Sequence, residues 1–165
     1  MFALDPHRFE ELLSRLQALC LDRKVTLATA ESCTGGMISG LLTCLSGSSA
    51  IYLGGLVTYS NESKIRLLGV TESQLRQHGA VSEVVASSMA QGARQRLGST
   101  WALAVTGIAG PSGGSAEKPV GTVYCAWSNE AKTVVRGFQL QGDRSAVRAQ
   151  TCWEALDGLF RQLHD

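Results

Sequence analysis

The stretch VTLATAESCTGGMISGLLTCL, residues 25–45, decides the fold because it passes from a strand through two glycines into a helix. Residues 25–31 (VTLATAE) form a short run of β-favouring residues, which predicts a strand. Residues 37–45 (MISGLLTCL) predict a helix, and Gly35 and Gly36 lie between the two. This succession is typical of open α/β folds, in which ligands collect at the carboxyl edge of the sheet.

The rest of the chain alternates in the same way. We predict helices over residues 5–21, 61–68, 71–77, 82–97 and 143–163, and strands over residues 50–60, 100–107, 120–128 and 132–140. Gly54 and Gly55 indicate a bulge or a close backbone approach. The last two strands are joined through NEA (129–131), a hairpin that makes the sheet mixed. We therefore expect a single domain over residues 1–165, an α/β fold built as a three-layer α/β/α sandwich with a mixed, mostly parallel sheet.

Composition narrows the classes of function. Fifteen Lys and Arg residues against fourteen Asp and Glu leave a formal net charge of +1, which does not support a broad nucleic-acid surface. The sequence has no apolar run of roughly 18 residues and no signal-peptide pattern at its start. Its five widely spaced cysteines favour neither a disulfide framework nor a zinc site. We expect a cytoplasmic protein with no nucleic-acid or membrane partner, no metal and no cofactor.

Residues 32–36 allow two uses of one turn. Ser32 or Thr34 can be the N-cap of the following helix. Alternatively, Ser32 is a nucleophile exposed at the sheet edge, as on the comparable turn of α/β-hydrolases, although their G-x-S-x-G pattern is absent. Free amides near Gly35 and Gly36 would then stabilise an oxyanion. The two uses are compatible, so both stay open.

A nucleophilic serine needs a base, and the sequence favours a lysine. The histidines are poorly placed, since they lie near the termini or at a predicted helix end: His7, His78 and His164. Lys64 ends TYSNESK (58–64), on the first turn of the helix after the strand at 50–60. A helix N-terminus disfavours a cation and so pushes this lysine toward neutrality. Tyr59 can relay or orient the proton. The alternative is a solvated Lys64 and a Tyr59 that only packs.

Two further segments are candidates for anion binding. TGIAGPSGG (106–114) matches neither common phosphate motif, and we expect a backbone nest around Gly107 and Gly110 with the Thr106 hydroxyl as an extra donor. Arg144 follows a predicted N-cap, Asp143, in the first turn of the last helix, where a cation is locally unfavourable. A phosphate contact would explain it. A flexible surface loop and a solvated helix face are the alternatives.

Seven segments taken together carry a family resemblance. They are TAESCTGG (29–36), GSSAIYLGGLVTYSNESK (47–64), LLGV (67–70), HGAVSE (78–83), ALAVTGIAGPSGG (102–114), EKPVGTVY (117–124) and GDRSAVR (142–148). In this order they resemble the CinA C-terminal domain family, which includes stand-alone nicotinamide mononucleotide deamidases. The resemblance implies an α/β/α fold and an amidohydrolase that converts nicotinamide mononucleotide to nicotinate mononucleotide and ammonia in pyridine nucleotide salvage.

The resemblance also assigns residues. The family's serine, tyrosine and lysine fall on Ser32, Tyr59 and Lys64, which we predict to be catalytic. The predicted substrate-binding residues are Glu31, Thr34, Gly35, Gly36, Thr106, Gly107, Gly110 and Arg144. In this scheme Thr34 supports the turn, and Glu31 either offsets the charge of the pyridinium ring or is a helix-start carboxylate. The expected partner is a small nucleotide substrate, and a homodimer or higher homo-oligomer fits the family.

Two alternatives from other classes of function stay open. One is a non-catalytic nucleotide-binding paralogue that uses the same anion sites without turnover. The other is an enzyme or redox sensor centred on Cys33, because a helix N-terminus lowers the pKa of a thiol. No second cysteine lies close to Cys33 in the sequence to resolve an oxidised thiol.

Overall fold

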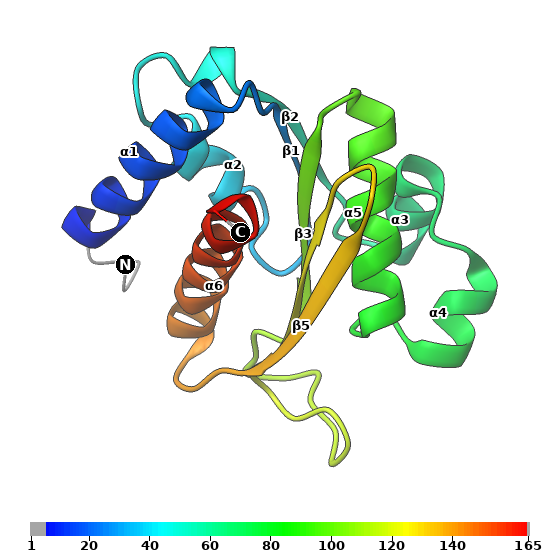
Figure 1. The fold of residues 1–165 in the computed structure, drawn as a ribbon. Coiled ribbons are helices and arrows are strands. Elements are labelled where there is room, and N and C mark those ends of the chain that lie inside the picture. Colours follow the sequence, from blue (N-terminus) through cyan, green and yellow to red (C-terminus); the bar gives the residue numbers. More distant parts are fainter. Residues whose placement is uncertain (1–5, 165) are drawn as a thin grey trace.

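The computed structural model describes residues 6–164, which form a sheet between two layers of helices (Figure 1). The α-helices are α1 (Pro6–Asp22), α2 (Met37–Leu42), α3 (Asn61–Leu68), α4 (Glu72–His78), α5 (Glu83–Leu97) and α6 (Arg144–His164), and Ser48–Ala50 form a short 3-10 helix, η1. The strands are β1 (Leu27–Glu31), β2 (Tyr52–Val57), β3 (Trp101–Gly107), β4 (Thr122–Ser128) and β5 (Thr133–Gln139). Asp5, where the first helix was expected to begin, lies outside the described residues.

The strands follow the order β2-β1-β3-β4-β5 across the sheet. β1 pairs in parallel with both of its neighbours, β2 and β3. β4 pairs antiparallel with β3 and with β5, so β4 runs against the other four strands. The predicted mixed, mostly parallel sheet is therefore confirmed, and so is the hairpin between its last two strands.

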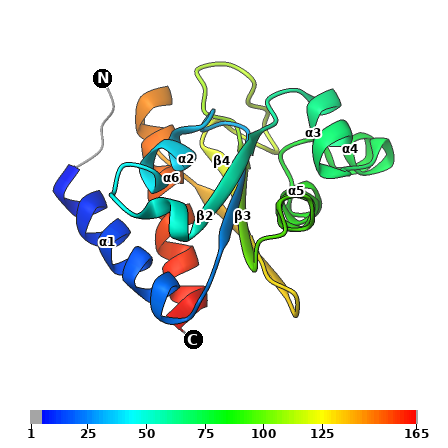
Figure 2. The same cartoon turned by 90° about the horizontal axis from the view of Figure 1, so that it is seen from above.

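Helices cover both faces of the sheet, as two views of the chain show (Figures 1 and 2). α1, α2 and α6 lie on one face, where Leu27, Leu103 and Trp127 of the sheet join the apolar stripes of α1 and α6 in one core. The indole Nε1 of Trp127 donates a hydrogen bond to the Ala155 carbonyl of α6 at 2.8 Å. The predicted three-layer sandwich is confirmed.

On the opposite face α5 packs against small side chains. Both surfaces of this contact consist largely of alanines. The sheet contributes Ala28, Ala30, Ala102, Ala104 and Ala126, and α5 contributes Ala86, Ala90 and Ala93. Small side chains allow the helix to approach the sheet closely. The contact between α5 and α3 is also close, at Gly92 of α5. A Cβ at that position would collide with the backbone of Leu68 in α3. The helix that carries Lys64, α3, therefore packs directly against α5.

The boundaries differ from the prediction by more than two residues at two elements. The helix expected over 37–45 ends at Leu42, because Thr43 is its C-cap and its hydroxyl donates to the Ser39 and Gly40 carbonyls. The strand expected over 50–60 is shorter at both ends, since β2 spans Tyr52–Val57.

The glycine pair in β2 behaves as predicted. The register against β1 shifts between Leu27 and Ala28, which is the expected bulge. A Cβ at Gly55 would collide with the hydroxyls of Thr29 and Tyr52, so the close approach is also present. Along residues 6–164, none of the helices combines the length and apolarity that crossing a membrane requires.

Candidate active site

A cavity of about 210 Å³ opens at the carboxyl ends of the parallel strands β1, β2 and β3. Ser32 follows β1, Tyr59 follows β2, and Thr106 and Gly107 end β3. Because parallel strands end at one edge of a sheet, these distant segments meet there. Six of the predicted site residues line the cavity: Ser32, Tyr59, Lys64, Thr106, Gly107 and Arg144. The other five predicted residues are not part of its lining: Glu31, Thr34, Gly35, Gly36 and Gly110.

Lys64 contacts Ser32 directly. Its Nζ donates hydrogen bonds to Ser32 Oγ at 3.0 Å and to the Thr58 carbonyl at 2.7 Å. The residue is only 1% exposed, and no carboxylate within residues 6–164 forms an ion pair with it. Burial disfavours the ammonium form and lowers the pKa of Lys64 from its ordinary 10.5 to about 8. The expected lowering is confirmed, but its cause is burial rather than the helix N-terminus.

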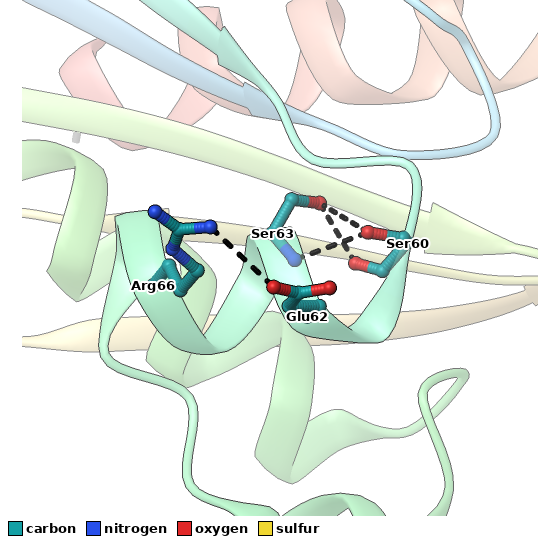
Figure 3. A network of polar contacts seen from close by, with 4 residues as sticks. All are labelled: Ser60, Glu62, Ser63 and Arg66. Carbon is teal, nitrogen blue, oxygen red and sulfur yellow. Dashed lines mark hydrogen bonds and ion pairs between the residues drawn. The ribbon is translucent and has the colours of Figure 1, made fainter.

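The first turn of α3, the helix that carries Lys64, is held by polar contacts of its own residues (Figure 3). Ser60 is the N-cap, and its Oγ accepts a hydrogen bond from the Ser63 amide at 3.1 Å. The Ser63 hydroxyl donates back to the Ser60 carbonyl at 2.8 Å. The exposed Glu62–Arg66 pair spans 3.4 Å along the same turn. The capped turn ends the β2 connection at a defined point, so that Lys64, one turn later, faces the end of β1.

Tyr59 and Arg144 meet at the rim of the cavity. Tyr59 is 63% exposed, and its hydroxyl accepts a hydrogen bond from Arg144 Nη2 at 3.1 Å. Arg144 Nη1 donates to the Gly110 carbonyl at 2.9 Å. Asp143 precedes α6 and accepts from the Ala146 amide, as a cap residue does. Among the residues that the structure describes, Arg144 has no carboxylate partner, so its charge can serve an anionic ligand.

Glu31 is the helix-start carboxylate of α2. It is fully buried, and its Oε2 accepts from Thr34 Oγ1 at 2.6 Å and from the Gly36 and Ile38 amides at 3.0 Å. Its Oε1 accepts from the amide and hydroxyl of Ser39 at 2.8 and 2.6 Å. Five donors therefore surround the carboxylate. Of the two roles considered for Glu31, the structure supports the helix start and contradicts an exposed charge facing a ligand.

This arrangement also corrects the predicted N-cap. Neither Ser32 nor Thr34 caps α2. The N-cap is Gly36, with φ 97° and no side-chain cap of its own. Glu31 supplies the acceptor from five residues upstream, which is a role that an Asp, Asn, Ser or Thr at the N-cap would normally fill. Thr34 supports the turn through its hydrogen bond to Glu31, as expected.

Free amides were expected near Gly35 and Gly36, but the amides of these two glycines are not free. The Gly35 N–H donates to the Ser32 carbonyl at 3.1 Å, and the Gly36 N–H donates to Glu31. Both glycines have positive φ, at 62° and 97°, which explains why glycine is favoured at each position. Their contribution is the shape of the turn, because an amide that already has an acceptor is not available to an oxyanion.

The glycine loop contributes differently from the prediction. The Thr106 hydroxyl donates to the Ala80 carbonyl at 2.9 Å, so it is not a free donor for an anion. Gly107 forms part of the cavity wall, where a Cβ would lie 2.6 Å from Val123 Cγ2. Gly110 acts through its carbonyl, which holds Arg144. In this structure the loop shapes the cavity and orients the arginine.

Cys33 lines the cavity beside Ser32. Burial raises the pKa of its thiol to about 12, so the thiol is protonated at neutral pH. A thiolate is the reactive form, and this environment therefore works against a cysteine-based nucleophile or redox sensor.

Two features were not predicted from the sequence. Arg148, one turn after Arg144, donates from Nε to the Cys33 carbonyl at 3.1 Å and from Nη2 to the Thr34 carbonyl at 2.7 Å. The spacing of four residues on one helix was the available signal. In addition, the α4–α5 connection provides the cavity wall at Ala80 and Val81. Lys118 holds this connection through the His78 and Val81 carbonyls at 2.7 and 2.8 Å.

Known proteins match this chain over nearly its full length. The family model of the CinA C-terminal domain matches residues 9–163. A CinA-like protein of Citrifermentans bemidjiense is 54% identical over 154 residues, which is 93% of this chain and 37% of that protein. A CinA-like protein of Mycobacterium marinum is 45% identical over 166 residues, 100% of this chain and 38% of its own length. The chain thus spans well under half of these curated relatives.

Solved structures agree in fold. The competence/damage inducible protein CihA of Agrobacterium tumefaciens is 42% identical with a TM-score of 0.93, and the match covers 99% of each chain. The competence damage-inducible protein A of Klebsiella pneumoniae is 36% identical with a TM-score of 0.92, and the match covers 94% of this chain and 97% of that one. The chain therefore belongs to the CinA C-terminal domain family.

Proposed function

We propose that this chain is an amidohydrolase that converts nicotinamide mononucleotide to nicotinate mononucleotide and ammonia, a step of pyridine nucleotide salvage. The observation that carries the proposal is the 3.0 Å contact between Lys64 Nζ and Ser32 Oγ in a buried site. A lysine whose pKa lies near 8 is neutral often enough to act as a general base. The choice of substrate follows the family resemblance.

The proposed reaction begins with the neutral form of Lys64. Its Nζ takes the proton of the Ser32 hydroxyl, and Oγ attacks the carboxamide carbon of the substrate. The ammonium group of Lys64 then returns the proton to the amide nitrogen, the C–N bond breaks, and ammonia leaves. Water, deprotonated by Lys64, hydrolyses the nicotinoyl ester and frees Ser32. The Thr58 carbonyl, at 2.7 Å from Nζ, keeps the amine beside Oγ through these steps.

In this proposal Tyr59 does not relay the proton between Ser32 and Lys64. Lys64 reaches Ser32 without an intermediary, while the Tyr59 hydroxyl contacts Arg144. We propose that Tyr59 and the Gly110 carbonyl orient the guanidinium of Arg144. The guanidinium would bind the 5′-phosphate of the nucleotide, since a planar fork suits two phosphate oxygens. A cytoplasmic location fits the five free cysteines.

The test is ammonia release from nicotinamide mononucleotide by the purified chain, after treatment with a chelator. We expect Ser32→Ala and Lys64→Met to abolish turnover while both variants still bind nucleotide. Arg144→Gln should raise KM for the mononucleotide and leave the KM for the nucleoside, which lacks the phosphate, nearly unchanged. Arg66→Gln is the matched control, because Arg66 forms an ion pair with Glu62 on the exposed side of α3.

Two outcomes would contradict the proposal. Full activity in a folded Ser32→Ala variant would remove Ser32 as the nucleophile. Thermal stabilisation by nucleotide without any ammonia release would instead support the non-catalytic, nucleotide-binding alternative.

A further inference from the structure

Asn61 differs from the other polar side chains of the cavity in having no partner within the fold. It lines the cavity, and among residues 6–164 its side-chain amide has no hydrogen-bond partner. Both halves of this amide, the carbonyl acceptor and the NH2 donor, are therefore available to a ligand. The other polar side chains of the lining are each bonded to a protein group: Ser32 to Lys64, Tyr59 to Arg144, and Thr106 to the Ala80 carbonyl.

No structural task of α3 explains why its first residue is an asparagine. The N-cap of this helix is Ser60, whose Oγ accepts a hydrogen bond from the Ser63 amide at 3.1 Å. Asn61 is exposed to solvent, so it adds nothing to the apolar core. Asparagine is also a weaker helix former than alanine. The residue is accounted for if it serves a ligand rather than the helix.

The geometry of α3 places Asn61 beside Lys64, closer to the mouth of the cavity. Residues three apart share one face of a helix, and the rise per residue separates them by about 4.5 Å along the axis. The Asn61 side chain therefore begins on the same side of α3 as Lys64. Lys64 is 1% exposed and contacts Ser32 Oγ at 3.0 Å, whereas Asn61 is exposed. Asn61 thus lies outward of the reacting pair.

The order of residues in this segment matches the order of groups in the nucleotide. Tyr59, at the rim, contacts Arg144, the residue proposed to bind the phosphate. Lys64 contacts Ser32, where the carboxamide is proposed to react. Asn61 lies between Tyr59 and Lys64 in the chain, just as the ribose lies between the phosphate and the nicotinamide ring. The group of the substrate that corresponds to Asn61 is therefore the sugar.

We propose that Asn61 is a specificity residue that binds the 2′- and 3′-hydroxyls of the ribose. The inference rests on the proposed function and extends it to the choice of sugar. The side-chain oxygen of Asn61 accepts from one hydroxyl, and its NH2 group donates to the neighbouring one, since hydroxyls both donate and accept. A site that hydrogen-bonds a substrate hydroxyl discriminates against the analogue that lacks it. The chain should therefore prefer the ribonucleotide to its 2′,3′-dideoxy analogue.

The test compares wild type and Asn61→Ala on nicotinamide mononucleotide and on its 2′,3′-dideoxy analogue, with the full chain. Loss of hydrogen bonds between neutral groups should raise the KM of the variant for the ribonucleotide about threefold to tenfold, with kcat nearly unchanged. For the dideoxy analogue the two proteins should have similar KM values, because the hydroxyls are already missing. Alanine is the better helix former, so the variant should fold at least as stably as wild type.

Glu62→Ala is the matched control on the same turn. Glu62 forms the exposed ion pair with Arg66 and is not part of the cavity lining, so its loss should leave both KM values unchanged. A second readout is the Kd of the product, nicotinate mononucleotide, and of its dideoxy analogue, measured by calorimetry. We expect Asn61→Ala to weaken binding of the ribonucleotide and to leave binding of the dideoxy analogue unchanged.

The outcomes separate this inference from the proposed function. An unchanged KM for the ribonucleotide in Asn61→Ala would overturn the role of Asn61 and leave the Ser32–Lys64 pair intact. An equal rise in KM for both nucleotides would overturn it as well, since the contact would then be to a group other than the sugar hydroxyls. If the wild-type chain releases no ammonia, the proposed function fails, and calorimetry decides about Asn61: the expected contrast in Kd supports its role, and equal Kd values in wild type and variant overturn it.

Discussion

Burial of the Lys64 amine destabilises its charged form, and the lowered pKa that results allows the side chain to act as a base. A solvated lysine is almost entirely protonated at neutral pH, and a buried lysine paired with a carboxylate would be as well. Lys64 has neutral partners, Ser32 Oγ and the Thr58 carbonyl. Both can accept from the ammonium form, but neither carries a charge that would stabilise it. This combination permits proton transfer in both directions.

The pH dependence of activity should report this environment. The base must be neutral, and the pKa of Lys64 is about 8, so kcat/KM should rise as the pH increases from 6.5, about tenfold per unit, and level off above pH 8. Initial rates of ammonia release between pH 6.5 and 9.5 provide the measurement. Lys64→Arg, which stays charged throughout, should be inactive at every pH. A profile that falls above pH 8 would show that the ammonium form is the active one.

Single residues differ in how far the sequence reveals them. Ser32 and Lys64 could be predicted to meet because each follows a strand of the same sheet edge. The hydrogen bonds of Glu31 and of the Gly35 and Gly36 amides could not, because the choice of acceptor depends on the path of the turn in space. A carboxylate five to eight residues from the amides that it binds gives no local capping pattern.

Among the elements, α3 links the core to the site. Its first turn is capped by Ser60 (Figure 3), and its last residue, Leu68, lies against Gly92 of α5. Lys64 sits between these two fixed points. Any displacement of α3 from α5 therefore moves the amine relative to Ser32, which belongs to a different element.

A pair of glycine substitutions tests this link. Gly92→Ala places a methyl group against the Leu68 backbone, and we expect it to lower the free energy of unfolding by about 1–3 kcal/mol and to reduce kcat. Gly40→Ala is the matched control: Gly40 lies inside α2 with no atom near its would-be Cβ. It should stabilise the protein by up to about 1 kcal/mol with activity unchanged. Chemical denaturation and steady-state rates measure both. Wild-type kcat in Gly92→Ala would show that the site does not depend on the close packing of α3 against α5.

The order of the elements was predictable, whereas some of their ends were not. Glycines follow α3 and α5 and separate β1 from α2, so the alternation of strands and helices is evident locally. The last turn expected for α2 is missing because the Thr43 side chain bonds back to the carbonyls of that helix. The pairing of β2 with β1 ends at Val57. The amide of Thr58, the next residue, still donates a hydrogen bond to the Glu31 carbonyl.

On the scale of the whole molecule, several polar and charged groups at or next to the site are buried within the fold. Lys64, Glu31 and Thr106 are nearly or fully inaccessible to solvent. Glu31 and Thr106 have their hydrogen bonds satisfied within the fold and so contribute to its stability. Lys64 is different, because its charged form has no counter-charge, and the fold must tolerate it. A stability cost at the reactive group is common in enzymes.

Linkage between protonation and folding makes this cost measurable. The pKa of Lys64 falls from 10.5 to about 8 on folding, so between these pH values the unfolded chain binds more protons than the folded chain. The free energy of unfolding should therefore rise with pH across this window. Relative to Lys64→Met, in which the other groups titrate alike, wild type should gain on the order of 2 to 3 kcal/mol between pH 7.5 and 10.5. Urea unfolding of both proteins across that range gives the difference. A constant gap would mean that Lys64 is charged equally in both states, and the neutral base on which the proposed chemistry depends would then be absent.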